Sequence, residues 1–491
     1  MLRTSELTPL VVESPRPLPS VISVSTLRRS AALTSLFLIT GVASLLMLSL
    51  VTQQNSSVSS VENLPSTESV NNHDDTFCGI TNYETGYIKL PNKNDDHFFY
   101  WFVESKSDPT RDPLVLWLTG GPGCSGMLAL LAENGPCHVL PDLSTTYNPY
   151  SWNRRANVIW LDQPSGVGYS YGLTEDINSD IVAENIYWFL QAFYKKRPDL
   201  ADREFFITGE SFGGHFVPNA ASYILKANML RHLYQSTVHI SLAGIAVGNG
   251  MTDPAVQSQH SVDMVHNSYN ISLLSGKSIE DMRNAQPVCQ KLIDRCQDER
   301  PSCIDAKDFC FGALEVPYFR SGRNPYDIRE PCTEVNIMQC FHFEHIETYL
   351  NLPKVQGRLG INVNKSKPWR ECDAAIGEGF ALKSFHSSAN EVKLLLDAGV
   401  RVLIYAGDAD LMCNWVGNQA WVMALDWSGK SGFNSALNRQ FVTSETRDAG
   451  RVRSFENLAF IRLFNAGHMV PMDQPAVSVD MIDKFFQNEE F

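Results

Sequence analysis

The sequence has no excess of basic residues and no internal repeat. Its 40 Lys and Arg residues are outnumbered by 54 Asp and Glu residues, for a net charge of −14, so we expect no nucleic-acid partner. The acidity fits simple solubility as well as it fits a secreted or acidic-organelle protein. The 491 residues, 44% of them hydrophobic, are enough for one large core and an inserted subdomain.

The eleven cysteines include no Cys-x-x-Cys pair, the spacing typical of structural zinc sites. Four of them recur every seven residues: Cys289, Cys296, Cys303 and Cys310. We interpret this spacing as disulfide bonding in a lumenal protein rather than as a metal knuckle, with one cysteine left over. We expect no metal and no cofactor.

A glycine-rich loop at residues 120–126 lacks the Lys-Ser or Lys-Thr pair that would hold phosphates and Mg²⁺, which argues against a phosphate loop. It follows residues 113–119, an apolar run that predicts a central strand. Because so many glycines let backbone N–H groups approach a ligand closely, we expect this loop to form half of an oxyanion hole.

The N-terminal region lacks charge over residues 31–51, a run long enough to span a bilayer. Arg28 and Arg29 precede it and no clear Ala-x-Ala cleavage site follows. We therefore expect a cytosolic segment at 1–29, a signal anchor in preference to a cleaved signal peptide at 30–51, and a lumenal remainder. The polar residues 52–75 predict a flexible stalk or pro-segment.

Three Asn-x-Ser sequons are glycosylation candidates in a lumenal protein, at Asn55, Asn270 and Asn364.

The strongest motif lies at residues 204–218. A β-prone apolar run meets Gly-Glu-Ser-Phe-Gly at residues 209–213, and a helix-like segment follows over residues 218–225. This order predicts a nucleophile elbow, a sharp turn from strand to helix that exposes the Ser211 hydroxyl. The N-terminus of the following helix offers backbone N–H groups to an oxyanion.

A serine needs a base and an orienting acid to act as a nucleophile. Residues 401–410 predict a buried strand that runs into Asp408 and Asp410, and residues 459–468 predict a second strand that runs into His468. The order Ser, Asp, His at strand ends is that of α/β hydrolases. This pattern alone leaves the choice between Asp408 and Asp410 open.

Other segments complete an α/β pattern. Strands are predicted at residues 97–104, 157–164 and 240–248, and a helix at 181–194. The pattern stops after residue 253 and resumes near Val400, with several cysteines in between. We expect one hydrolase core formed by residues 76–253 and 373–491. We expect residues 254–372 to form an inserted cap that is cross-linked by disulfides.

Six segments, collinear from about residue 83 to the C-terminus, closely resemble the serine carboxypeptidase family, which includes the carboxypeptidase Y and cathepsin A types. They are residues 117–124, 157–164, 209–215, 248–254, 405–414 and 466–473. The resemblance implies an α/β-hydrolase fold with a mostly parallel central sheet. It also implies Ser211 as nucleophile, His468 as base, Asp410 as its partner, and oxyanion N–H groups at Gly121 and Phe212.

The same resemblance assigns Glu133 and Glu210 to the binding of the substrate's terminal carboxylate, beside Thr119 and Gly120. No basic residue stands in these motifs. Two carboxyl groups in contact cannot both ionise cheaply, so one keeps its proton and can donate a hydrogen bond to a substrate carboxylate. This predicts peptidase activity that is favoured at acidic pH.

For the cysteines, the resemblance implies the disulfides Cys289–Cys310, Cys296–Cys303, Cys332–Cys340 and Cys124–Cys372. It implies that Cys413 is a free thiol in the substrate pocket. Cys78 and Cys137 then remain, and we expect them to pair. Met469 is either part of the pocket for the leaving residue or simply a packed methionine.

The predicted function is therefore that of a serine carboxypeptidase of the secretory pathway, acting in a vacuole-like or lysosome-like compartment or after secretion on peptides and proteins with a free C-terminus. Two alternatives remain. Many family members carry Asn where this chain has Thr119, and some relatives with Thr are plant acyltransferases, so acyl transfer to an alcohol is one. The other is a lumenal partner that protects other hydrolases, as cathepsin A-like relatives can.

Overall fold

The computed structural model describes residues 77–173, 176–231, 237–298, 300–334 and 340–491. The predicted cytosolic segment, signal anchor and stalk, together with Asn55, lie outside these residues. Within the described ranges, no helix is both long enough and apolar enough to cross a membrane.

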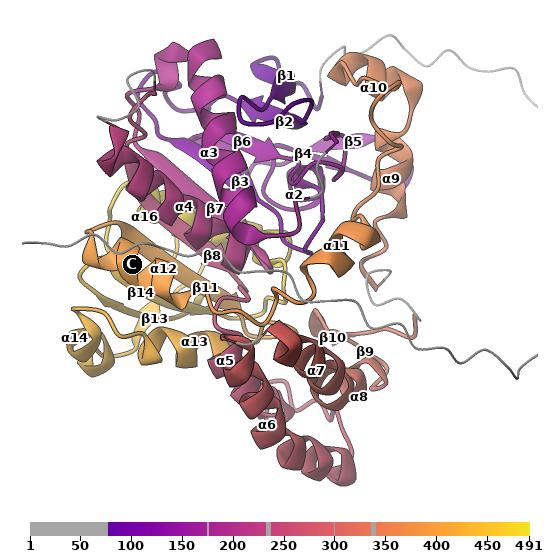
Figure 1. Ribbon diagram of the computed structural model, residues 1–491, viewed down its shortest axis with the longest axis vertical. Helices are drawn as coiled ribbons and strands as arrows, with labels where there is room; N and C mark the ends of the chain where they lie inside the picture. The colour runs from indigo at the N-terminus through magenta and orange to yellow at the C-terminus, as the bar shows by residue number, and fades with distance from the viewer. Residues whose placement is uncertain (1–76, 174–175, 232–236, 299, 335–339) are drawn as a thin grey trace, which may run out of the picture. The chain divides into compact units, whose positions relative to one another are not determined.

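The described part of the chain is organised around a ten-stranded sheet (Figure 1). The strands lie in the order β1 (Tyr83–Lys89), β2 (His97–Val103), β6 (Asn157–Leu161), β3 (Leu114–Leu118), β7 (Phe205–Glu210), β8 (Leu242–Gly248), β11 (Arg401–Gly407), β14 (Leu458–Leu463), β13 (Gly450–Phe455) and β12 (Arg439–Phe441). The six strands from β6 to β14 are parallel, and the two pairs at the edges are antiparallel.

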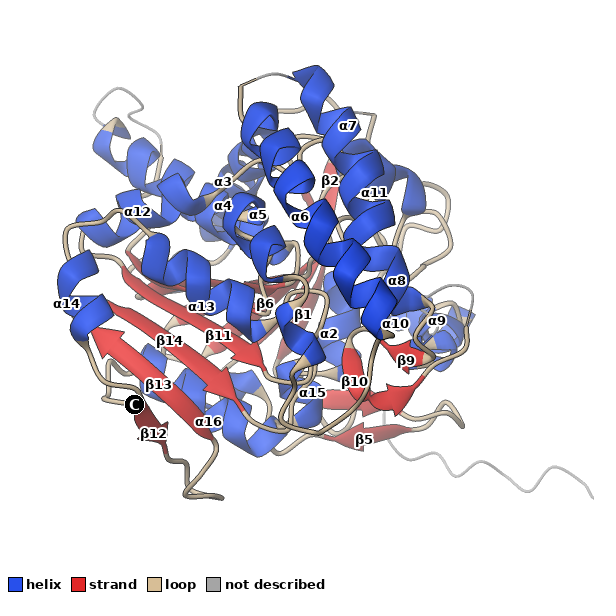
Figure 2. Cartoon of the chain, turned by 90° about the horizontal axis from the view of Figure 1, so that it is seen from below, coloured by secondary structure: helices blue, strands red, loops and turns tan. Residues whose placement is uncertain are grey.

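Helices cover both faces of the sheet, which explains why every residue of β3, β6 and β7 is buried. Neighbouring side chains of one strand therefore enter different cores: Ile207 packs in one hydrophobic cluster and Phe206 in the other. In Figure 2, α12 and α13 lie on one side of the strands β11, β14 and β13, and α16 lies on the other.

The first cluster is supplied by α3 (Ser179–Lys196), α4 (Gly213–Met229), α12 (Ala389–Asp397), α13 (Trp415–Ala424) and α14 (Lys430–Ser435). The second is supplied by α2 (Gly126–Ala132), α9 (Glu344–Leu350), α10 (Pro353–Leu359) and α16 (Pro475–Phe486). Smaller elements that contribute to the second cluster are α15 (Val470–Asp473) and β4 (Cys137–Val139), which forms a hairpin with β5 (Thr145–Tyr147).

The segment predicted as a cap, 254–372, has two structural parts. The first has a small hydrophobic cluster of its own, which also takes Ala409 and Leu411 from the loop after β11. Its elements are α5 (Pro254–Gln257), α6 (Gly276–Cys296), α7 (Arg300–Cys310), a π-helical turn (Phe311–Glu315), α8 (Val316–Phe319), β9 (Arg323–Asn324) and β10 (Asp327–Pro331). The second part, α9 and α10, packs with the sheet instead.

Five disulfides join the described residues: Cys78–Cys137, Cys124–Cys372, Cys289–Cys310, Cys296–Cys303 and Cys332–Cys340. These are the pairs expected from the resemblance, together with the expected pair of the two remaining cysteines. Cys413 is free and buried. Cys289–Cys310 lies inside the small cap cluster, and Cys296–Cys303 joins the same two helices, α6 and α7.

One expectation about local structure was wrong. The helix after the elbow begins at Gly213 rather than at Pro218, and Pro218 lies inside α4. The first turns can form here because Gly213 and Gly214 carry no side chain. A Cβ on Gly214 would lie 2.5 Å from the Met251 carbonyl oxygen. The helix therefore starts directly at the nucleophile turn, where its free N–H groups are useful.

Candidate active site

Ser211 occupies the turn between β7 and α4, and it has a left-handed backbone with φ +61°. This conformation is uncommon for a residue with a Cβ. Three hydrogen bonds hold it: the Ser211 N–H donates to the Gly248 carbonyl (3.1 Å), and the Ser211 carbonyl accepts from Gly214 and Met251 (2.9 Å each). The turn thus has the geometry of the predicted nucleophile elbow.

Asp410 and His468 are brought together at the carboxyl ends of β11 and β14. His468 Nδ1 lies 2.7 Å from Asp410 Oδ2, and both side chains are buried. The carboxylate also accepts the backbone N–H groups of Met412 (3.0 Å) and Cys413 (3.2 Å). Because these donors fix the carboxylate, the Nδ1 atom carries the proton and Nε2 is left as the basic nitrogen.

Asp408, the alternative that the strand pattern left open, faces a different set of partners. Its carboxylate pairs with Arg462 (3.0 Å) and accepts the Tyr269 hydroxyl (2.5 Å) and the Asn465 N–H (3.1 Å). Arg462 belongs to β14 and Tyr269 to the cap cluster. Asp408 therefore ties the cap to the sheet, whereas Asp410 orients the imidazole.

Asn249, at the end of β8, was not identified as a site residue from the sequence. Its amide nitrogen donates to Asp410 Oδ2 (2.8 Å), and its amide oxygen accepts the Gly407 N–H (3.0 Å). It is fully buried. Asn249 thus positions the carboxylate from a neighbouring strand, a role that only the sheet order could reveal, although the residue lies in a segment that carried the family resemblance.

Among the described residues, no hydrogen bond joins the Ser211 hydroxyl to His468. Such catalytic hydrogen bonds are often long without substrate and tighten when a substrate binds. The two residues nevertheless lie at the same edge of the sheet, because Ser211 follows β7 and His468 follows β14, parallel strands that are separated by β8 and β11.

The glycine-rich loop lies directly against the nucleophile turn. A Cβ on Gly120 would stand 2.4 Å from the Phe212 backbone nitrogen and 2.8 Å from Ser211 Cβ. Gly121 adopts φ +106°, which favours glycine. Phe212 is the residue before α4. The N–H groups of Gly121 and Phe212 are thus close enough in the fold to serve one oxyanion.

The loop is fixed at its far end by the Cys124–Cys372 disulfide and by two backbone hydrogen bonds. The Ser125 N–H donates to Glu371, and the Asp373 N–H donates to Gly123 (2.9 Å each). Ser125 also caps α2 by accepting the Met127 N–H. The loop is therefore held between a helix and the segment at residues 371–373.

Glu133 and Glu210 form a buried pair of carboxyl groups. Glu133 ends α2 and Glu210 ends β7, immediately before Ser211. Burial, followed by the charge of the partner, raises the pKa of Glu210 well above its usual range, and burial also raises the pKa of Glu133. The pair therefore holds protons at acidic pH, and Glu133 Oε2 and Glu210 Oε2 have no hydrogen-bond partner among the described residues.

Thr119, at the end of β3, is linked to a residue that sequence reasoning did not single out. The Trp117 indole N–H donates to Thr119 Oγ1 (2.9 Å), and both side chains are buried. Because the hydroxyl oxygen accepts this bond, its own proton is available for another acceptor.

The whole arrangement can perform acyl transfer at a carbonyl group that lies next to a free carboxylate. It provides a nucleophile, a base with its acid, two backbone donors and a protonated carboxyl pair. Comparisons with known proteins agree. Residues 78–488 match the family model described as serine carboxypeptidase. This chain belongs to the serine carboxypeptidase family.

Curated relatives of this carboxypeptidase are similar over most of its length. Carboxypeptidase Y of Candida albicans is 38% identical over 82% of the chain and 73% of that protein. Vacuolar serine-type carboxypeptidase ATG42 of Saccharomyces cerevisiae is 38% identical over 82% of the chain and 78% of that protein. The structure of the Kex1 carboxypeptidase from the same yeast has the same fold, with a TM-score of 0.72 at 24% identity over 83% of the chain and 91% of that structure.

A cavity of the carboxypeptidase opens beside its oxyanion loop and has a volume of about 500 Å³. Gly121, Phe212 and Cys413 line it. Burial raises the pKa of the Cys413 thiol well above its usual range, so the thiol is neutral. Met469 is buried within the second hydrophobic cluster, and it is not among the described residues that line this cavity.

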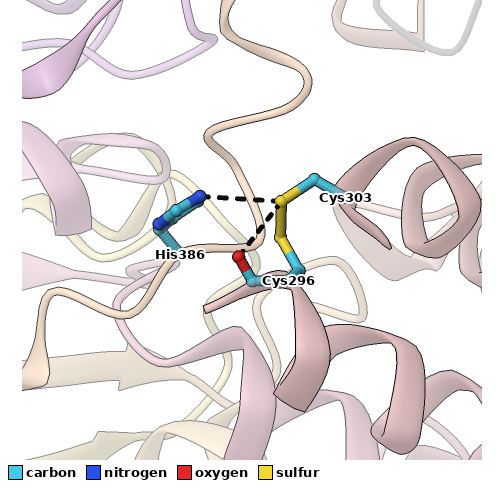
Figure 3. A group of neighbouring side chains, drawn as sticks. All are labelled: Cys296, Cys303 and His386. Carbon is cyan, nitrogen blue, oxygen red and sulfur yellow. Dashed lines mark hydrogen bonds between the residues drawn. A yellow bond between two sulfur atoms is a disulfide. The ribbon is translucent and has the colours of Figure 1, made fainter. Parts of the chain in front are cut away.

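The carboxypeptidase brings two of the seven-spaced cysteines close to a histidine. Cys296 and Cys303 are joined as a disulfide, and His386 Nε2 lies 3.6 Å from Cys303 Sγ (Figure 3). Disulfide sulfurs carry no thiolate charge with which to bind a metal. The contact instead lies beside two hydrogen bonds that join the end of α6 to residues 385–387. Gln297 Nε2 donates to the Phe385 carbonyl (2.7 Å), and Gln297 Oε1 accepts the Ser387 N–H (3.0 Å).

Two of the three predicted glycosylation sites lie in the described ranges. Asn270 and Asn364 are both exposed. Their side chains are accessible to a sugar-transferring enzyme, so the sequence prediction stays open at both positions.

Proposed function

We propose that Ser211 of this carboxypeptidase attacks the last peptide bond of its substrate and forms an acyl-enzyme. His468 Nε2 takes the hydroxyl proton and passes it to the leaving nitrogen, so that the C-terminal amino acid departs. Water then attacks the ester, and His468 takes a proton from the water and returns one to Ser211. Asp410 holds the imidazole orientation, which is supported by the 2.7 Å contact between Asp410 Oδ2 and His468 Nδ1.

In this proposal the oxyanion accepts hydrogen bonds from the N–H groups of Gly121 and Phe212. Support comes from the close approach of the two segments, since Gly120 leaves no room for a Cβ beside the Phe212 nitrogen. Preorganised backbone donors of this kind lower the barrier of acyl transfer by about 3 kcal/mol each.

The substrate's terminal carboxylate is bound by the Glu133 and Glu210 pair, with the Thr119 hydroxyl as a further donor. The single observation that carries the exopeptidase proposal is this buried pair next to the nucleophile, because burial raises the pKa of both groups. A protonated carboxyl donates a hydrogen bond to an anion, whereas an ionised pair repels it. Peptide hydrolysis is therefore favoured at acidic pH and declines as the pair loses protons.

The acidic requirement fits an acidic compartment of the secretory pathway, and we place the enzyme in a vacuole-like compartment on that ground. Five disulfides support an oxidising compartment. The name of the yeast relative, a vacuolar carboxypeptidase, points the same way. Residues 30–51 would carry the chain into this pathway as a signal anchor or a signal peptide.

The test is mass spectrometry of an N-terminally blocked peptide incubated with the purified enzyme between pH 4 and pH 8. We expect stepwise loss of C-terminal residues, strongest at acidic pH. Ser211→Ala is the control, and it should retain the fold and lose turnover. Substantial turnover by the pure Ser211→Ala variant would contradict the role of the serine.

Acyl transfer to an alcohol is the second candidate, because Thr119 stands where many carboxypeptidases carry Asn. The hydrogen bond from Trp117 leaves the Thr119 proton free to donate to a substrate carboxylate, which supports the peptidase. The same experiment separates the two reactions. A peptide that stays intact at every pH, with an enzyme that still reacts with a serine-directed acylating probe, would favour acyl transfer.

A further inference from the structure

The cavity beside the oxyanion loop carries one partly buried acidic group among largely apolar walls. Its sides include Met251, Ile293, Leu314, Phe385 and Leu411. Glu315 lines the same cavity and is partly buried. Within the described residues, the Glu315 carboxyl makes no hydrogen bond or ion pair, so it is an unpartnered acid inside the substrate pocket.

Local helix geometry brings Glu315 to the cavity. The π-helical turn Phe311–Glu315 separates α7 from α8, and Phe311, Leu314, Glu315 and Tyr318 all line the cavity. A π turn adds a residue to the helical repeat and shifts the side chains that follow it, and such turns are frequent at functional sites. Glu315 thus lines the cavity together with its apolar neighbours.

The cavity lies on the acyl side of the scissile bond. It is lined by the oxyanion residues Gly121 and Phe212. The described residues that line it do not include the carboxylate-binding residues Glu133, Glu210 and Thr119. Since the leaving residue is held by its carboxylate at that pair, this cavity receives the side chain of the residue before it.

We propose that Glu315 makes this enzyme select substrates whose penultimate residue, on the acyl side of the cleaved bond, is lysine or arginine. The inference rests on the proposed function. A long basic side chain matches the cavity in two respects, because its aliphatic stem packs against apolar walls and its cation pairs with the carboxylate at the end.

The charges that face Glu315 from neighbouring elements permit this pairing. Lys307 and Asp308 on α7 also line the cavity, and both are exposed to solvent, so water screens them. Tyr318 on α8 and Cys413 after β11 are neutral groups, since burial raises the pKa of each. A cationic side chain therefore meets no buried cation in the described part of this cavity.

The preference has a pH dependence of defined sign. Burial raises the pKa of Glu315 to about 7, so the empty pocket holds it neutral at acidic pH and accepts apolar side chains there. A bound lysine favours the ionised form. Selection for lysine over an apolar residue of equal length therefore increases as the pH rises from 5 to 7.

The test compares two blocked peptides that differ only at the penultimate residue, lysine in one and norleucine in the other. The measured quantity is the ratio of kcat/KM values at pH 5, 6 and 7, in which the pH dependence shared by both substrates cancels. We expect the wild-type ratio to rise with pH, and Glu315→Gln to lower the ratio at pH 7 by about tenfold or more.

Asp308→Asn is the matched control, because it removes the same charge from the same helical segment at the exposed mouth of the cavity. We expect it to change the ratio by less than about twofold. An equal loss in both variants, a Glu315→Gln ratio equal to that of the wild type, or a wild-type ratio that is flat from pH 5 to 7 would each overturn the proposal. Failure of the wild type to cleave either peptide would instead overturn the proposed function on which it rests.

Discussion

The two aspartates after β11 show how neighbouring residues of one type acquire different tasks. Asp410 contacts His468, and Asp408 pairs with Arg462 and Tyr269. The strand pattern predicts that a carboxylate lies here but cannot choose between them, because both follow the same buried strand. The partners that distinguish them come from β14 and the cap, more than 50 residues away in the sequence.

Replacing each aspartate by asparagine tests this division. In Asp410→Asn, the amide no longer stabilises the proton on His468 Nδ1, so we expect kcat to fall by about 10³- to 10⁴-fold with the melting temperature little changed. In Asp408→Asn, we expect kcat to stay within about tenfold and the melting temperature to fall, because Arg462 loses the charge of its buried partner. Steady-state kinetics measures kcat, and thermal unfolding measures the melting temperature, of both variants. The opposite distribution of effects would show that the assignment is wrong.

At the scale of elements, the site depends on the contact between the glycine-rich loop and the turn from β7 to α4. The glycines of both segments were recognisable in the sequence, and so were the strands that precede them. Their close approach was expected from the family resemblance and not from the local pattern, because it depends on β3 and β7 being neighbours in the sheet. The start of α4 at Gly213 was missed for a different reason: Pro218 is locally a typical first residue of a helix.

Gly120→Ala tests the contact at this scale. A Cβ here would stand 2.4 Å from the Phe212 backbone nitrogen, and backbone cannot move aside as a side chain can. We expect the loop to shift away from the elbow and kcat to fall about 10²-fold or more, as when an oxyanion donor is lost. Gly276→Ala is the control, because a Cβ on Gly276 would have no atom within 4 Å and this residue starts an exposed helix. Equal and near-normal activity of the two variants would contradict the proposed oxyanion geometry.

The cap illustrates a further limit of sequence reasoning. The break in the α/β pattern and the cysteine spacing predict an insertion, and the structure has a separate hydrophobic cluster there. Nothing in the pattern of apolar residues predicts that Glu315, in a π turn, lines the cavity beside the oxyanion loop. Likewise, no local signal identifies Asn249 as a partner of Asp410, because that hydrogen bond crosses from β8 to the loop after β11.

At the scale of the whole molecule, acid–base chemistry extends beyond the active site. Burial raises the pKa of several carboxyl groups far from one another in the sequence: Glu133, Asp162, Glu210, Glu315, Glu371, Asp473 and Asp483. For example, the pKa of Asp162 is raised to about 6 and that of Glu371 to about 7. At these carboxyl groups the folded state binds protons that the unfolded state releases, whereas His215, whose pKa burial lowers to about 4, acts in the opposite sense below pH 6.5.

This difference predicts a stability maximum at acidic pH. The stabilising contribution of these groups is complete below their unfolded pKa values of 3.8 and 4.5 and is lost as the pH rises through the folded values. A buried carboxyl shifted by two pKa units changes the free energy of unfolding by about 3 kcal/mol. We expect the melting temperature to fall between pH 5 and pH 8 by about 5 °C or more. A melting temperature that rises over this range would contradict the expected direction.

The central claim is that a protonated carboxyl pair recognises the free C-terminus beside Ser211. The most direct measurement compares one blocked peptide with its C-terminal amide from pH 5 to pH 8, in the wild type and in a variant that combines Glu133→Gln with Glu210→Gln. At pH 5 we expect the wild type to cleave the free acid with a kcat/KM about 10- to 100-fold above that of the amide. This ratio corresponds to the free energy of one hydrogen bond to a charged group. This advantage should shrink toward pH 8 in the wild type and be independent of pH in the variant. Equal cleavage of acid and amide at pH 5, or an advantage that the double substitution leaves equally dependent on pH, would contradict the account.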